Sequence, residues 1–133
     1  MPRASGPFEV SLKPLPMDND PGSDLLGRMS IDKQFRGDLE GKSKGQMLTG
    51  GTAIKTSAGY VAIERVTGSL KGRKGSFILQ HTGLMTRGAP SLVITVVPDS
   101  GTDQLEGLKG TMTINIEAGK HLYQLDYTFA DQA

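Results

Sequence analysis

The 133-residue sequence contains no cysteine, which excludes disulfide bonds and thiolate chemistry and suits a reducing compartment. It also contains no apolar run that approaches the ~20 residues a membrane helix needs, so we expect no membrane partner. The opening residues, Met1 to Gly6, lack the apolar core of a signal peptide. Together these absences predict a soluble cytoplasmic protein.

An excess of charge of one sign is also missing. Fifteen basic and fourteen acidic residues leave a formal net charge of +1, so no electrostatic field attracts nucleic acid or an anionic membrane. A local basic cluster at Lys71–Lys74 contains a glycine and is typical of a turn. We therefore expect no nucleic-acid partner.

Motifs that hold cofactors and metals are lacking as well. The glycine-rich pieces at residues 72–75 and 107–110 have no helix after them, and a phosphate cradle needs a helix N-terminus or a nest. With only His81 and His121 and no cysteine, a dedicated zinc site is not expected. We predict no cofactor and no metal.

What the sequence does contain is a run of short strand-like segments. Eighteen glycines and seven prolines separate stretches rich in Val, Ile, Thr, Phe and Tyr, and no window shows a sustained helical period. We expect a loose tail at residues 1–6, one domain at residues 7–133 and one long link from Pro14 to Leu26. The predicted strands are Phe8–Lys13, Arg28–Asp38, Ser43–Thr56, Tyr60–Ser69, Ser76–Thr86, Leu92–Val97, Leu105–Glu117 and His121–Phe129.

The last two strands can be paired directly from the sequence. A two-residue turn at Ala118-Gly119 pairs Glu117 with Lys120 and, further along, Met112 with Leu125. One face of the resulting hairpin is apolar and the other is mostly polar. Turn chemistry and side-chain pattern therefore indicate the same register.

A second hairpin brings together two residues that could do chemistry. A turn at Gly72-Arg73 places Glu64 directly opposite His81, with Cβ atoms roughly 4.5–5.5 Å apart. A three-residue turn would instead place Arg65 opposite His81. We favour the first register, which puts Glu64 and His81 on one face with Tyr60 and Phe77.

Antiparallel strands, short connections and glycines inside strands predict an all-β fold. Strand glycines allow the bends that barrel closure requires, and closure removes exposed sheet edges. We predict a closed eight-stranded antiparallel up-and-down (meander) barrel, with a β-sandwich as the alternative.

Several ordered blocks carry a resemblance over residues 8–129. They are Phe35–Gly41, Glu64–Gly83, Val96–Thr102, Leu105–Gly110 and Tyr123–Tyr127. In these blocks the chain resembles an uncharacterised bacterial family of small barrels that carries only a domain-of-unknown-function label. The resemblance implies a closed eight-stranded meander barrel, grouped structurally with allene oxide cyclase. It does not imply that enzyme's reaction, because none of the cyclase's catalytic residues can be matched here.

Glu64 and His81 are the candidate catalytic residues. A carboxylate beside an imidazole can fix the tautomer of the ring and raise its basicity, which makes a general acid–base pair. The alternative is a structural polar pair that links two strands. Tyr60, Phe77, Tyr123 and Tyr127 are the candidate ligand-binding residues, because tyrosines in an apolar cavity suit a small aromatic or lipid-like molecule. Ordinary core packing is the alternative for these four.

Three functions remain open at this stage. The first is a barrel that binds a small apolar or aromatic molecule in its interior without turnover. The second is an isomerase or cyclase that acts on a lipid- or polyketide-like substrate through Glu64 and His81, so the sequence does not decide whether the protein is an enzyme. The third is a structural oligomeric barrel without ligand. We also expect a homo-oligomer, dimer or trimer, because Leu92–Val97 is apolar on both faces and its outer side needs a cover.

Overall fold

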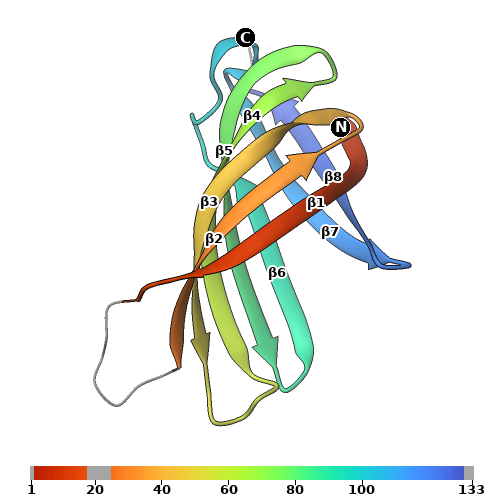
Figure 1. Cartoon of the computed structure of the whole chain (residues 1–133). Coiled ribbons are helices and arrows are strands. Elements are labelled where there is room, and N and C mark those ends of the chain that lie inside the picture. Colours follow the sequence, from red (N-terminus) through yellow and green to blue (C-terminus); the bar gives the residue numbers. More distant parts are fainter. Residues whose placement is uncertain (1, 18–24, 131–133) are drawn as a thin grey trace.

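The computed structural model describes residues 2–17 and 25–130, which form a closed antiparallel barrel. Each strand pairs with the next one in sequence, and β8 returns to β1 (Figure 1). The predicted all-β meander barrel is therefore confirmed. The described part of the chain has no helix long and apolar enough to cross a membrane. The elements are β1 (Arg3–Leu15), β2 (Leu26–Phe35), β3 (Leu39–Gly51), β4 (Ala58–Leu70), β5 (Arg73–Thr86), β6 (Ala89–Val96), the single 3-10 turn η1 (Asp103–Leu105), β7 (Leu108–Glu117) and β8 (Lys120–Phe129).

Side chains alternate between the inside and the outside of the barrel along each strand. In β4, Ala62, Glu64 and Val66 are buried, whereas Val61 and Ile63, which alternate with them, are exposed. This alternation assigns an inner and an outer face to every strand. In each strand, the inner face consists of the buried residues and of every second residue in line with them, and the outer face consists of the residues that alternate with these.

The β7–β8 hairpin has the register that the sequence predicts. Glu117 pairs with Lys120 and Met112 with Leu125. The two turn residues, Ala118 and Gly119, have φ angles of 50° and 79°. Positive φ at both central residues is the mark of a type I′ turn, whose twist matches that of the flanking strands.

The β4–β5 hairpin differs from the predicted register. Its turn is Lys71-Gly72, so Glu64 lies opposite Leu79 and His81 lies opposite Ala62. Both the predicted Gly72-Arg73 turn and the three-residue alternative are therefore wrong. Because side chains alternate with a period of two, a shift of two residues keeps Glu64 and His81 on the same inner face. They are diagonal neighbours instead of direct ones.

The ends of several strands also differ from the prediction. Arg3 to Gly6, predicted as part of a loose tail, belong to β1 and pair with β8, and Ala4 is fully buried. The predicted strand from Leu105 begins only at Leu108, because Leu105 belongs to η1 and its N–H donates to the Thr102 carbonyl. Most of the predicted link from Pro14 to Leu26 lies outside the described residues.

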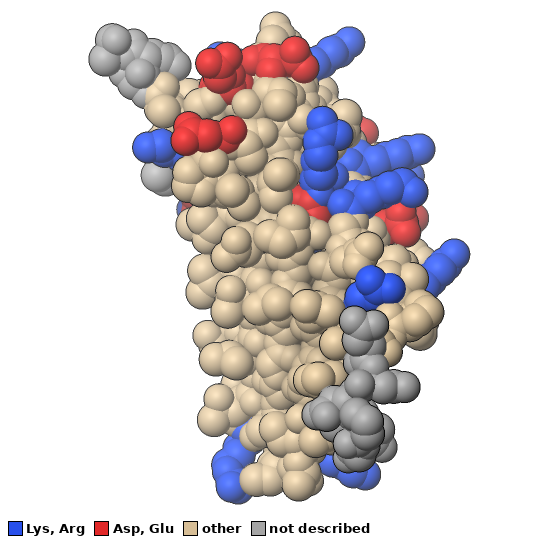
Figure 2. All heavy atoms as spheres, turned by 90° about the vertical axis from the view of Figure 1, so that its left-hand side faces the viewer, with Lys and Arg blue, Asp and Glu red and all other residues tan. Residues whose placement is uncertain are grey.

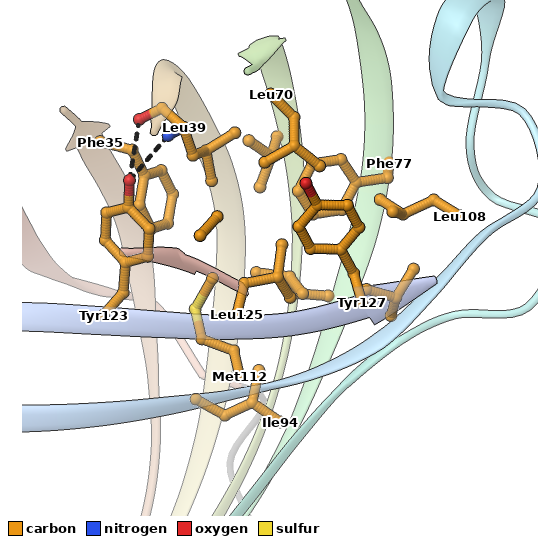
Figure 3. Close-up of a cluster of buried hydrophobic side chains, with 14 of the residues drawn as sticks. Phe35, Leu39, Leu70, Phe77, Ile94, Leu108, Met112, Tyr123, Leu125 and Tyr127 are labelled. Atoms are coloured by element: carbon orange, nitrogen blue, oxygen red, sulfur yellow. Dashed lines mark hydrogen bonds between the residues drawn. The ribbon is translucent and has the colours of Figure 1, made fainter. Parts of the chain in front are cut away.

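The barrel has two halves that differ in packing. Near η1 and the end of β8, side chains from all eight strands and η1 meet in one apolar core, which we call the packed half (Figure 3). Phe35, Leu39, Phe77, Leu105, Tyr123 and Leu125 are almost completely buried there.

The opposite half is open along one side. β6 pairs with β7 only through Ile94–Met112 and Thr95–Thr111, and the β7–β8 hairpin then diverges from β6 (Figure 1). Beyond Phe8, β1 pairs with β2 alone. The inner faces of β1 to β6 in this open half remain partly uncovered, and Leu12 and Leu92 are each 42% exposed.

Candidate functional site

Four polar side chains lie buried side by side on the inner faces of four consecutive strands. They are Lys33 on β2, Ser43 on β3, Glu64 on β4 and His81 on β5. We call them the polar cluster. Burial of polar groups costs free energy unless each finds a partner, so the contacts within the cluster decide its role.

Glu64 is the centre of the polar cluster and is 0% exposed. Its Oε2 atom accepts a hydrogen bond from Lys33 Nζ at 2.7 Å and lies 2.5 Å from His81 Nε2. Its Oε1 atom accepts a hydrogen bond from the Ser43 hydroxyl at 2.6 Å. Three donors from three other strands therefore converge on one carboxylate, and charge-assisted bonds of this kind are the strong ones.

These contacts determine the charge of Glu64. Burial alone would raise the pKa of the carboxyl group, because a low-dielectric interior disfavours the ionised form. The hydrogen bond from His81, the charge and hydrogen bond of Lys33, and the hydrogen bond from Ser43 outweigh burial and lower the pKa to about 2. Glu64 is therefore ionised at neutral pH and balances the buried ammonium group of Lys33.

The ionised carboxylate also fixes the orientation of His81. A carboxylate can only accept hydrogen bonds. His81 Nε2 must therefore carry a proton and donate a hydrogen bond to Glu64. Within the described residues, the other ring nitrogen, Nδ1, has no hydrogen-bond partner. In a neutral ring Nδ1 would then be the acceptor, which is the arrangement of a general base held by a carboxylate.

Lys33 and Ser43 were missed by the sequence analysis, although a signal for Lys33 was present. Ile31, Lys33 and Phe35 alternate along β2, and the two apolar residues mark this as the buried face. The ammonium group lies 5.2 Å from the ring centroid of Phe8 and 5.6 Å from that of Phe35. Such cation–π contacts help to compensate a buried cation. For Ser43, alternation along β3 from Leu39 gives the same indication.

A pocket of about 600 Å³ lies in the open half. Residues of four consecutive strands, β3 to β6, line it together with Leu25, which precedes β2; among them are Tyr60, Met85, Pro90 and Leu92. The Tyr60 ring is 6.4 Å from the His81 ring, centroid to centroid, so the pocket is adjacent to the polar cluster. Burial and the charge of Glu64 both raise the pKa of Tyr60, which keeps its hydroxyl protonated.

The strand glycines Gly68 and Gly83 do not leave free space beside Glu64 and His81. Gly83 is the cross-strand partner of Tyr60, and the Tyr60 ring occupies the position where a side chain at residue 83 would begin. At Gly68, the backbone of Glu40 and Gly41 occupies that position. Both glycines thus allow close packing instead of forming a cavity.

Of the four predicted ligand-binding residues, only Tyr60 lines this pocket. Phe77, Tyr123 and Tyr127 belong to the packed half. The Tyr123 hydroxyl accepts a hydrogen bond from the Leu39 N–H and donates toward the carbonyls of Arg36 and Leu39 (Figure 3). Burial, together with the nearby charges of Asp38 and Glu40 and despite the Leu39 N–H bond, raises its pKa to about 12. Tyr123 thus fastens the β2–β3 turn to the core.

Metal binding finds no support in the described residues, which contain no group of three or more His, Cys, Asp or Glu able to hold an ion. The polar cluster offers one carboxylate and one imidazole, and both are already bonded to each other. Its chemistry is therefore that of proton transfer or polar support.

The comparisons with known proteins identify one family. A family model described as "Protein of unknown function (DUF3224)" matches residues 4–127. A crystal structure of a DUF3224 protein with unknown function from Shewanella oneidensis MR-1 is 49% identical, with a TM-score of 0.94 over 99% of both chains. Among the curated proteins, none matches this chain. The predicted resemblance to an uncharacterised family is confirmed, and the grouping with allene oxide cyclase stays a prediction.

Proposed function

Because the chain belongs to the DUF3224 family, whose function is unknown, we propose from its geometry that it binds a small apolar or aromatic molecule in the open half of the barrel. The observation that carries the proposal is the uncovered inner face around Tyr60, Met85 and Leu92. Its volume of about 600 Å³ falls within the ~300–1,000 Å³ typical of small-molecule sites.

The chemistry of the lining supports an apolar ligand with few polar groups. Leucine, methionine and proline are the large aliphatic residues of the lining, and Tyr60 adds an aromatic ring with one hydroxyl. Apolar surface released from water by such a ligand contributes roughly 25 cal/mol per Å². The interior of the packed half, by contrast, is filled by the protein's own side chains, so the ligand is placed in the open half only.

Turnover is the second candidate, and one observation favours it. His81 Nδ1 lacks a partner among the described residues while Glu64 holds Nε2, as a general base requires. However, His81 is only 4% exposed, so little of its ring is open to a substrate. Binding without turnover therefore ranks first.

Leu92 and Val93 provide a matched pair of positions for the test. They are neighbours on β6, but Leu92 faces the pocket and Val93 faces outward, at 42% and 57% exposure. The probe is N-phenylnaphthylamine, a neutral dye whose fluorescence rises in apolar sites. We expect the wild type to bind it, Leu92→Gln to bind it about tenfold more weakly, and Val93→Gln to be unchanged.

Two results would contradict the proposal. One is a wild type that leaves the dye fluorescence unchanged. The other is an equal loss in both variants, because that would place the dye outside the pocket. Native mass spectrometry of the purified protein then identifies any molecule that accompanies it. His81→Ala separates the two candidates. If turnover is the function, this substitution removes the conversion of that molecule. If binding alone is the function, it leaves dye binding in place.

A further inference from the structure

The outward-facing side chains of β4, β5 and β6 in the open half form an uncharged surface. It comprises the outer-face residues within 59–63, 78–84 and 91–95, and we call it the outer β4–β6 face. No Lys, Arg, Asp or Glu occurs in these three ranges, although 22% of the whole chain is charged. In Figure 2 the charged groups gather toward the top, the right and the lower tip, and a broad tan surface lies between them.

Large apolar side chains lie together on this face. Val61 pairs across the sheet with Thr82, and Thr82 in turn pairs with Val93. Val61, Ile63, Leu84 and Val93 are 50%, 48%, 58% and 57% exposed. The outer face of a barrel strand in water is normally polar, and a contiguous apolar patch marks an interaction surface.

The absence of charge indicates what covers the face. A different protein is normally selected by complementary charges, and this face offers none for such selection. A second copy of the same chain needs no complementary charge, because an uncharged patch can meet itself without like-charge repulsion. Contact between identical patches generates a twofold axis.

The size of the face indicates how strong the contact is. Three strands plus the adjoining Leu48 of β3 span ~19 Å at ~4.8 Å per strand, and seven residues span ~23 Å along a strand. Two such patches bury on the order of 1,000 Å² in total, the low end for a specific interface. The dimer should therefore dissociate at micromolar concentrations instead of being obligate.

The charges at the border of the face locate the axis. Arg28, Lys44 and Arg65 lie on outer positions of β2, β3 and β4. An axis through this basic edge would bring like charges together. An axis near Val61 and Val93 avoids the clash and buries the apolar side chains at the centre.

We propose that the outer β4–β6 face is the interface of a twofold homodimer of this chain. The interface covers the outside of the strands that carry Glu64 and His81 on their inner faces. Gly59, Leu84 and Ser91 of this face also line the pocket of the open half, whereas Ile63 and Val93 do not, so substitutions at Ile63 and Val93 test the interface without altering the pocket lining.

The test is the mass of the full chain in solution, measured by light scattering after size exclusion over a micromolar concentration series. We expect the wild type to move from one chain to two chains as concentration rises, and to remain dimeric in about 1 M salt, where exposed charge contacts are screened. Val93→Lys and Ile63→Lys should each remain monomeric. Ser11→Lys, an exposed outer position on β1, should dimerise like the wild type.

Circular dichroism and thermal melting establish that the lysine variants fold, and Val93→Thr gives a milder change that retains strand propensity. Folded monomers would support the interface. The proposal is overturned by a wild type that stays monomeric throughout the series, by an assembly of three chains, or by a dimer that survives both lysine substitutions.

Discussion

At the scale of single residues, the stability of this fold is most sensitive to the buried charges of Lys33 and Glu64. Both side chains are more than nine-tenths buried, and each is the other's only oppositely charged partner among the described residues. Two charges removed from water cost several kcal/mol each, and their attraction compensates this cost only while both are present. Removing one of these two side chains should therefore destabilise the barrel much more than removing both together.

A double-mutant cycle tests this dependence. Lys33→Met should lower the free energy of unfolding by about 3–5 kcal/mol, because Glu64 loses its buried counter-ion. Adding Glu64→Gln to Lys33→Met should recover most of this loss, because the amide oxygen can still accept from His81 while the amide NH2 donates to the Ser43 hydroxyl. Urea unfolding of Lys33→Met, of Glu64→Gln and of the double variant completes the cycle. Additive losses would show that the two side chains act independently.

Acid stability reports on the same carboxylate. The pKa of Glu64 falls from 4.5 to about 2 on folding, so its contribution is complete above pH 4.5 and is lost as the pH falls toward 2. The loss is on the order of 3 kcal/mol at 1.36 kcal/mol per pKa unit. The double variant Lys33→Met/Glu64→Gln serves as the reference, because it retains the other carboxylates.

We expect the unfolding free energy of the wild type to fall by about 3 kcal/mol relative to that of the double variant between pH 4.5 and 2, as followed by urea titration at each pH. Parallel curves across this window would mean that the pKa of Glu64 does not change on folding.

At the scale of strands and turns, the sequence predicts most of the architecture but not every register. Three hairpins turn through a non-glycine residue followed by glycine: Lys71-Gly72, Arg87-Gly88 and Ala118-Gly119, all with positive φ. The prediction placed the third correctly but put Gly72 first in its turn. Either position of Gly72 gives a plausible turn locally, and only packing of the whole barrel selects one.

The candidate site was predictable in part for a similar reason. Glu64 and His81 lie on one inner face in either register, so a shift of two residues did not separate them. Lys33 comes from β2, and no local pattern indicates that its ammonium group reaches Glu64. The same holds for Phe77, Tyr123 and Tyr127, because a tyrosine at a core position resembles one in a ligand cavity until the neighbouring side chains are known.

The turn geometry yields a prediction of its own. Ala118 adopts a φ of 50°, a region that asparagine tolerates much better than alanine. Ala118→Asn creates the preferred Asn-Gly type I′ pair and should raise the free energy of unfolding by about 0.5–1 kcal/mol. Ala89→Asn, in the strand β6 and without positive φ, serves as the control and should give no gain. Urea unfolding distinguishes the two, and equal effects would contradict the turn assignment.

At the scale of the whole molecule, the packed half of the barrel is filled by an apolar core and the open half is uncovered along one side. The packed half contains the buried aromatic residues, whereas the open half exposes Leu12, Met85 and Leu92 on its inner side. The opening follows from β6, whose first residues pair with β5 but not with β7. Pro90 fits this position, because proline is confined to strand edges that need no further hydrogen bond.

Hydrogen exchange should reveal the opening directly. Amides in residues 89–93 that point away from β5 have no strand partner, so we expect them to exchange nearly as fast as in an unstructured peptide. Amides of β4, which is paired on both sides, should be protected by the full stability of the fold. Uniform protection along β6 would show that β7 closes the barrel along its whole length.

The pairing of β1 with β8 also affects how the protein is made. Arg3 and Asp126, which hold these strands together at their outer faces, are 123 residues apart in the chain. A ribosome releases β1 before β8, so until β8 has been synthesised the residues from Arg3 to Pro7 have no strand partner and the apolar interior of the nascent chain is uncovered. Pairing between such distant segments is also intrinsically slow. During translation, the unfinished barrel therefore depends on protection from aggregation until its eighth strand emerges.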